Sequence, residues 1–468
     1  MKQIRILSLF WCLASSTSLN AQDSLQVFRY DQFIQTVLDH HPISFQAELD
    51  QQQGEAYLLK AKGAFDPKLG ADVAQKYFEG KKYYGLHSGM LKIPTWTGID
   101  IETSFEQNEG VFLNGADNTP TAGLWAAGIS LPLGRGLFID ERRAMIKQAR
   151  LFVQQSILER TLTLNELIYE AGKSYWYWLE AYYIRQVYLE AYTVAQERAD
   201  AISQGALLGD RPFIDTVEAN IQVQNRQVNL QQATLNYQNS VAHFNTYLWA
   251  DGFVPLELAA TAIPDILEDQ NATPVDLELE AQLVQLLDRH PMLLQNQYKI
   301  QSLEVEKKLK REFLKPTVDL KYNALMASTN ENLINNFSLN DYKWGVTFSL
   351  PLFLRKERGD LALTNIKLQD ANLDIKNKFN SIQSKSIMAR NTWDTTHQQF
   401  NTLEENVAAY QALLAGEQAL FENGESSLFL INSREMGYID AQTKLIITLT
   451  KNKIANLETL YALGILNL

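Results

Sequence analysis

Few residues of this chain have the type and spacing that enzyme chemistry requires. The sequence contains no Gly-x-Ser-x-Gly motif, no phosphate-binding glycine loop followed by lysine, and no His-Glu-x-x-His pair. Among its six histidines only His40 and His41 are adjacent, and no other pair has metal-ligand spacing. We therefore expect neither an enzyme nor a cofactor or metal site.

Two of the histidines, His41 and His290, instead mark an internal duplication. Each precedes a proline in a matching block, residues 38–42 and 287–291, and a second proline follows 25 residues later in both copies. Because the two histidines occupy equivalent positions, we expect a helix-ending or packing role for them rather than metal binding. The repeat is marked by six prolines: Pro42, Pro67, Pro132, Pro291, Pro316 and Pro351.

The duplication continues along the chain. Ser-Leu-Pro-Leu occurs at 130–133 and 349–352, each time before a long proline-free tract that ends near a glycine, Gly209 or Gly424. The first repeat (22–249) is predicted to hold a helix, strands within about 68–132, a long helix over about 140–206 and a helix over about 213–248. An inter-repeat segment (250–280) follows. The second repeat (281–468) is predicted to hold a helix, strands within about 317–352, a long helix over about 358–423 and a helix over about 428–463.

The N-terminus has the layout of a secretory signal peptide. Lys2 and Arg5 precede an apolar run, and small residues lead to an expected cleavage after Ala21, so residues 1–21 are predicted to be removed. The only cysteine, Cys12, lies in this segment. Losing Lys2 and Arg5 changes the formal net charge from −12 to −14. This acidic balance argues against a nucleic-acid partner.

The proline-free tracts predict very long helices. At 1.5 Å per residue, each long helix would span about 100 Å, and a shorter helix stacked on an inter-proline helix would nearly match it. After Pro212, one heptad series contains Ile221 and Val228, and a second contains Val223 and Leu230. The two series lie on nearly opposite sides of the helix, which indicates neighbours on both sides, as in a closed wall of helices.

The strand regions alternate between apolar and polar residues. Residues 318–326 and 344–350 show this pattern in the second repeat, and residues 99–105 and 125–131 show it in the first. Such alternation fits either a soluble sheet or membrane β-strands. No apolar run of 18 residues follows the signal peptide, so a membrane crossing would have to use strands, and a few strands could close only by oligomerisation.

Together these features resemble the TolC family of outer-membrane efflux channels. The resemblance rests on the duplicated Leu-x-x-His-Pro blocks, the Ser-Leu-Pro-Leu ends, the glycine turns and the C-terminal residues 462–466. It implies a mainly α fold with β strands, in which a homotrimer forms a periplasmic α-barrel continued by a β-barrel in the outer membrane of a Gram-negative bacterium. The implied partners are outer-membrane lipid, a periplasmic adaptor (membrane fusion) protein and an inner-membrane pump of the RND, ABC or MFS type.

The expected function is a passive export duct for a tripartite efflux or type I secretion system. The alternative is a secreted soluble coiled-coil scaffold or periplasmic adaptor without channel activity. One departure from the family concerns the strands, because the first repeat carries 30 extra residues between its prolines. We expect the family's four membrane strands plus an additional hairpin, with a larger barrel as the alternative.

The turns are the expected functional positions. In the family, an acidic pair follows the second turn and forms a ring at the entrance; here the equivalent positions of the first turn carry Asp215 and Glu218. These acids either form the ring or merely favour a helix N-terminus. The remaining entrance candidates are Asp210, Arg211, Glu422 and Glu425, which could form salt bridges or contact the adaptor, and the turn residues Gly209, Pro212 and Gly424.

A further cluster, Tyr175-Trp176-Tyr177-Trp178, stands out on the first long helix. We expect it to pack in a core against the inter-repeat segment rather than to bind a ligand.

Overall fold

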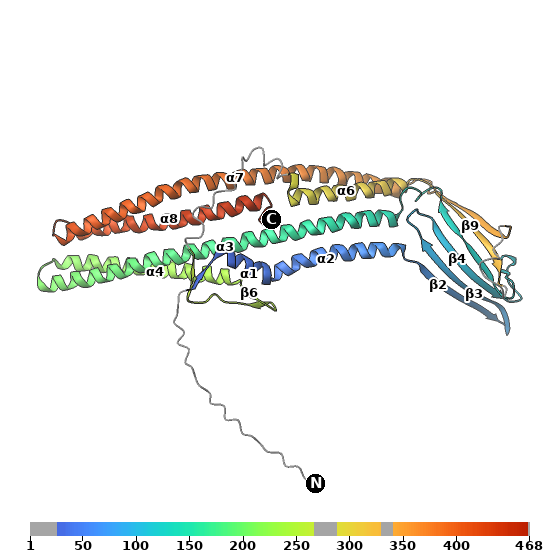
Figure 1. The fold of residues 1–468 in the computed structure, drawn as a ribbon, viewed down its shortest axis with the longest axis horizontal. Coiled ribbons are helices and arrows are strands. Elements are labelled where there is room, and N and C mark those ends of the chain that lie inside the picture. The colour runs from blue at the N-terminus through green and yellow to red at the C-terminus, as the bar shows by residue number, and fades with distance from the viewer. Residues whose placement is uncertain (1–25, 266–287, 329–339, 467–468) are drawn as a thin grey trace, which may run out of the picture.

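The computed structural model describes residues 26–265, 288–328 and 340–466. The predicted signal peptide and residues 266–280 of the predicted inter-repeat segment lie outside the described residues. The molecule is long and narrow, with two glycine turns at one end of the helices and a sheet at the other (Figure 1). No helix among the described residues has the length and apolar character needed to cross a membrane.

The two repeats follow the same order of elements. The first contains β1 (Gln26–Phe28), α1 (Tyr30–His40), α2 (Pro42–Lys62), β2 (Lys68–Phe78), β3 (Lys81–Pro94), β4 (Asp100–Glu109), β5 (Leu124–Pro132), α3 (Glu141–Leu208) and α4 (Phe213–Asn245). The short strands β6 (Trp249–Ala250), β7 (Val254–Pro255) and β8 (Ala262–Pro264) follow. The second contains α6 (Pro291–Glu312), β9 (Thr317–Ala327), β10 (Tyr342–Ser349), α7 (Arg355–Glu422) and α8 (Leu428–Ala462).

The helices α3 and α7 correspond to the two predicted long helices. Each has 68 residues and spans about 100 Å. The Asp140 carboxylate caps α3 by accepting the backbone N–H of Arg143 at 2.9 Å. Along α3 lie α4 and then α2, and along α7 lie α8 and then α6 (Figure 1). The expected end-to-end stacking of a shorter helix and an inter-proline helix is therefore present in both repeats.

His41 and His290 connect these stacked helices. Each imidazole Nδ1 accepts the backbone N–H two residues further on, at 3.2 Å, and so caps α2 or α6. Each ring is also hydrogen-bonded to the backbone at the far end of the shorter helix, at Thr246 after α4 or Ala462 of α8. Burial lowers the pKa of both histidines. They are neutral helix caps, in agreement with the expected helix-ending role.

All the long strands belong to one antiparallel sheet with the order β10-β9-β5-β4-β3-β2. The 30 extra residues contribute two additional strands, and these are paired on both sides within the sheet rather than standing apart from it. The sequence predicted four membrane strands and a separate additional hairpin. Instead, the hairpin strands β3 and β4 lie inside the sheet, which has six strands in succession. Every residue of the two edge strands, β2 and β10, is exposed.

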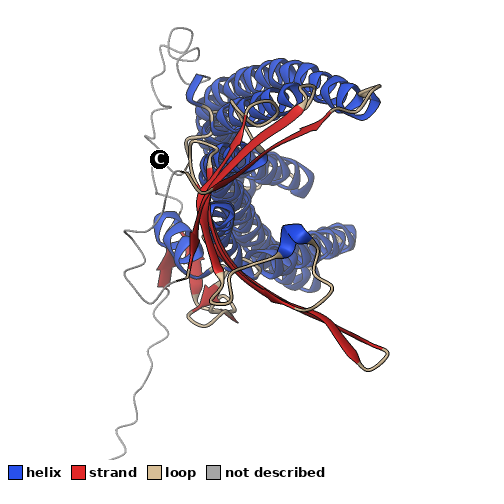
Figure 2. Ribbon diagram, turned by 90° about the vertical axis from the view of Figure 1, so that its right-hand side faces the viewer, coloured by secondary structure: helices blue, strands red, loops and turns tan. Residues whose placement is uncertain are grey.

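The register gives the sheet two different faces, as the alternation predicted. Residues of the apolar face include Leu69, Val73, Leu91, Ile101, Phe105, Trp125, Ile129, Leu320, Tyr322, Trp344, Val346 and Phe348. Residues of the opposite face include Asp72, Lys76, Lys92, Glu102, Ser104, Ser130, Asp319, Lys321, Lys343 and Thr347. Seen end-on, the sheet and the helices curve in the same sense and form a trough that is open on one side (Figure 2).

The largest core lies at the middle of the long helices and is built from aromatic side chains. Tyr175, Trp178, Phe33 and Phe244 are fully buried there, and the rings of Phe33 and Phe244 stack with centroids 4.4 Å apart. The Tyr175 hydroxyl accepts the backbone N–H of Asp265 at 3.3 Å. Tyr175, Trp176 and Trp178 of the aromatic cluster therefore pack in the core and contact the inter-repeat segment, as expected, whereas Tyr177 is 48% exposed.

Candidate functional site

The entrance candidates lie where the helices reverse direction. Gly209 and Gly424 adopt φ values of 84° and 78°, a conformation that side chains with a Cβ rarely tolerate. In each turn the residue after the glycine donates its N–H five residues back, Asp210 to Gly205 at 2.9 Å and Glu425 to Leu420 at 2.8 Å. The two turns lie at the same end of the molecule (Figure 1). The structure thus brings the predicted turn residues of both repeats to one end.

An apolar cluster holds the two turns together. Buried Ala199, Ile202 and Ala219 of the first repeat pack with Leu428 of the second. The Arg211 guanidinium lies 4.3 Å from the centroid of the Phe421 ring. In the described chain Asp210, Glu422 and Glu425 are exposed and make no salt bridge within one copy. Their predicted role in the assembled entrance remains a prediction.

A buried charge network lies just above the turns. Arg198 of α3 donates two hydrogen bonds to Glu435 of α8, at 2.9 and 3.2 Å, and Arg226 of α4 lies 3.7 Å from the same carboxylate. The side chains of Glu435 and Arg226 are only 7% and 2% exposed. Such a network ties three helices together, because removing one partner would leave the others charged and out of water.

Glu218, one of the two predicted ring acids, is connected to this network. Its carboxylate accepts the Asn432 amide N–H at 3.3 Å, and the Asn432 oxygen accepts from Arg198 at 3.3 Å. Asp215 lies in the first turn of α4 and is partly exposed. Glu218 therefore faces α8 in one copy, and whether the pair forms an acidic ring remains a prediction.

Arg226 and Glu435 were not among the residues selected from the sequence. A signal does exist for Arg226, since it occupies a heptad position whose neighbours seven residues away, Ala219 and Ala233, are small and buried. A charged residue in a series of buried alanines indicates a buried ion pair. Glu435 carries no comparable pattern.

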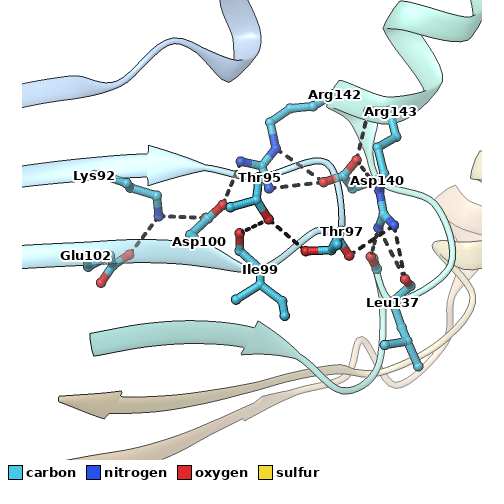
Figure 3. Close-up of polar contacts among 11 residues, drawn as sticks. Lys92, Thr95, Thr97, Ile99, Asp100, Glu102, Leu137, Asp140, Arg142 and Arg143 are labelled. Atoms are coloured by element: carbon cyan, nitrogen blue, oxygen red, sulfur yellow. Dashed lines mark hydrogen bonds and ion pairs between the residues drawn. The ribbon is translucent and has the colours of Figure 1, made fainter. Parts of the chain in front are cut away.

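A second charged cluster fastens the sheet to the helices (Figure 3). Asp100, at the start of β4, accepts from Lys92 at 3.0 Å and from Arg142 of α3 at 2.8 Å. Arg142 also pairs with Asp140 at 3.1 Å, and Arg143 donates to the Thr97 carbonyl at 3.4 Å. The turn between β3 and β4 is thereby connected to the first turn of α3.

The cluster also sets the charge states of its members. Burial alone would raise the pKa of Asp140, but hydrogen bonds from Arg143 and the charges of Arg143 and Arg142 hold it below its usual value. Burial would likewise lower the pKa of Arg142, and the hydrogen bond and charge of Asp100 raise it instead. Asp140 and Arg142 are therefore charged at neutral pH. No group of three or more His, Cys, Asp or Glu side chains in the described residues could hold a metal ion.

Comparison with known proteins agrees with this architecture. The fold is similar to the crystal structure of CusC, with 14% identity, 93% of this chain and 92% of that chain covered, and a TM-score of 0.66. It is also similar to the Campylobacter jejuni outer membrane channel CmeC (12% identity, 99% and 94% covered, TM-score 0.65). A third similar structure is the Vibrio cholerae outer membrane protein VceC (12% identity, 93% and 96% covered, TM-score 0.64). No curated protein matches the sequence.

The fold is therefore that of the outer-membrane channel structures to which this chain is similar. Residues 283–463, most of the second repeat, match the model of the outer membrane efflux protein family. The predicted resemblance to the TolC family of outer-membrane efflux proteins is thereby confirmed, and the predicted outer-membrane location agrees with it.

Proposed function

We propose that three copies of this chain close into a passive export duct that crosses the outer membrane and continues through the periplasm. No bond is made or broken in the duct. An inner-membrane pump supplies the work, and a periplasmic adaptor connects that pump to the turn end of the helices. The family match and the fold support this proposal.

The order of packed elements is the observation that carries the proposal. The helix α3 packs against α4 and α2 on one side and against α8 and α6 on the other, and these last two pack against α7 (Figure 1). One edge of the chain is therefore α4, α2 and β2, and the opposite edge is α7 and β10. Each edge has an uncovered row of apolar side chains.

On the α4 edge, Ile221, Val228 and Leu235 of one predicted heptad series are 49%, 61% and 48% exposed. On the α7 edge, Ile366 and Leu373 are 60% and 61% exposed. The sheet has open edges on the same two sides, with unpaired backbone groups on β2 and β10. Contact between unlike edges of successive copies covers both rows and both sheet edges, and a curved chain repeated in this way closes into a ring.

Within such a ring, the polar face of the sheet lines the lumen and the apolar face contacts outer-membrane lipid. At the other end, the network of Arg198, Arg226 and Glu435 holds α8 against α3 and α4. Separating these helices would leave charges without partners, so the network stabilises a closed entrance. Opening then requires force or binding energy from the adaptor and pump.

Planar bilayer recording of the purified protein tests the proposal. A duct gives discrete conductance steps from a species that extracts with the outer membrane. The alternative of a soluble scaffold or adaptor gives no steps and stays in the soluble fraction. The apolar face of a sheet joined continuously to the helices favours the duct.

A further inference from the structure

The six strands that each copy contributes set the width of the proposed duct at its outlet. The sequence predicts the family's four membrane strands per copy plus an additional hairpin, with a larger barrel as the alternative. We infer that the ring closes an eighteen-stranded barrel, six strands from each of three copies, whose outlet is as wide as the helical part of the duct. This inference rests on the proposed function and concerns the strand number alone.

The strands β3 and β4 are full members of the sheet. Pairing of β2 with β3 runs from Lys68 opposite Lys92 to Phe78 opposite Lys81. Pairing of β3 with β4 runs from Pro94 opposite Asp100 to Gly85 opposite Glu109. The two strands have 14 and 10 residues, and about 9–11 tilted residues cross a bilayer. Both are therefore long enough to span the membrane with their neighbours.

The side chains of β3 and β4 also fall on the same apolar and polar faces as those of their neighbours. Leu91 and Ile101 share the apolar face with the side chains of β2 and β5, and Lys92 and Glu102 share the polar face. On that polar face Lys92 pairs with Glu102 at 2.9 Å, and Lys321 of β9 approaches the same carboxylate at 3.9 Å. From Gly89 to Ile93 of β3 and from Ile101 to Phe105 of β4 the added strands thus continue both faces of the sheet, and further along the apolar face His87 is paired with Gln107.

The added hairpin is also fastened to the helices, at the turn between β3 and β4. Arg142 and Arg143, in the first turn of α3, bind Asp100 and the Thr97 carbonyl (Figure 3). Gly98 lies in the same turn with φ of 88°, and a Cβ there would approach the Arg143 guanidinium to 2.8 Å. The turn is therefore shaped to receive these arginines, which hold β3 and β4 at the same height as β5.

The arc that six strands cover matches the arc that the helices of the same copy cover. Strands about 4.8 Å apart and tilted by about 40° each occupy about 6.3 Å of circumference, so six strands cover about 38 Å and four would cover about 25 Å. The adjoining helical wall contains four helices per copy, α2, α3, α6 and α7. At an interaxial spacing of about 8–10 Å these cover about 32–40 Å. Six strands match the helical arc, whereas four would narrow the duct at the membrane.

For three copies, eighteen strands give a backbone diameter of about 36 Å and twelve give about 24 Å. Barrels of 16–18 strands leave an aqueous channel. A solute that passes the helical part therefore meets no narrower outlet, and the turn end is the constriction that limits its size.

Electron cryomicroscopy of the full-length assembly in lipid nanodiscs tests the inference. We expect eighteen strands and a backbone diameter of about 36 Å. A variant lacking residues 81–121, which include β3 and β4, should give twelve strands and about 24 Å. Twelve strands in the unaltered protein, or equal diameters in both proteins, would overturn the inference. Absence of any ring would instead overturn the proposed function.

If the deletion variant fails to assemble, a disulfide test shows whether β4 lies beside β5 in the barrel. Thr103 of β4 is paired with Ala127 of β5, and the only native cysteine is Cys12. The double variant Thr103→Cys/Ala127→Cys should form an intrachain disulfide in the membrane-inserted ring. Two free thiols in that ring would show that β4 is not in the barrel.

Discussion

Replacing Glu435 by glutamine tests the buried network near the turns most sharply. The carboxylate of Glu435 is shared by Arg198 and Arg226, whose side chains are 15% and 2% exposed. Glutamine keeps the size of the side chain and removes its charge. The buried Nε of Arg226 has no hydrogen-bond partner within the described chain, and besides Glu435 the guanidinium contacts only a weak acceptor there, the Met436 sulfur, at 3.7 Å from Nη1.

The size of the effect follows from burial. Breaking a buried ion pair by removing one partner costs about 3–5 kcal/mol, because the remaining charge stays out of water. In the proposed duct the network is intact only when α8 lies against α3 and α4. Since each 1.4 kcal/mol is a factor of ten in an equilibrium constant, Glu435→Gln should shift the closed-to-open equilibrium toward open by about 10²-fold to about 4 × 10³-fold.

Single-channel recording in planar bilayers measures this shift as open probability. Glu197→Gln is the matched control, because it makes the same chemical change at an exposed residue of α3 that is not among the entrance candidates. We expect the control to behave like the unaltered protein. An open probability for Glu435→Gln that equals the control would refute the assignment of the network to gating.

Three other predictions follow from the remaining features. Asp215→Asn with Glu218→Gln should lower the preference for cations, seen as a shifted reversal potential under a salt gradient, because an acidic ring attracts cations. Burial lowers the pKa of His41 and His290 below 6.5, so the unfolded chain binds their protons first and the melting temperature should fall as the pH drops below about 6.5. Gly98→Ala should reduce the free energy of unfolding by about 1–2 kcal/mol, measured by denaturant titration, because its φ is positive.

Each of these has its own control. An unchanged reversal potential would discard the acidic ring. The double variant His41→Gln/His290→Gln should flatten the dependence of melting temperature on pH between 5 and 7, and a profile identical to that of the unaltered protein would exclude the histidines as its cause. For Gly98, the control is Gly89→Ala in β3, where an added Cβ would meet no heavy atom within 4 Å. Equal losses at both glycines would contradict the argument from backbone conformation.

Much of the fold could be predicted because the same sequence signals occur in both repeats. The paired prolines, with His41 and His290 before them, indicated where the inter-proline helices begin, and the proline-free tracts corresponded to α3 and α7. Both signals are local, since proline restricts its own backbone and removes one hydrogen-bond donor. The alternation of apolar and polar residues in the strands is also a local signal, and it predicted the two faces of the sheet.

Features that depend on long-range contact were predicted less well. Membership of β3 and β4 in the sheet depends on pairing with β2 and β5 and on Arg142, none of which alternation alone reveals. Glu435 was missed because its partners Arg198 and Arg226 lie more than 200 positions earlier in the chain. Of the two heptad series in α4, the one containing Ile221 is uncovered in a single copy, and so it reports on assembly rather than on the fold of the chain.

Closure through unlike edges is the central claim, and one cross-linking measurement tests it directly. Ile221 of α4 and Leu413 of α7 are 49% and 43% exposed, and they lie 12 and 11 residues from Gly209 and Gly424, hence at similar heights above the turns. The variant Ile221→Cys/Leu413→Cys, oxidised in native membranes and separated by mass, should form linked species that stop at three chains. Material that remains monomeric, or that extends beyond three chains without a limit, would contradict the closed ring.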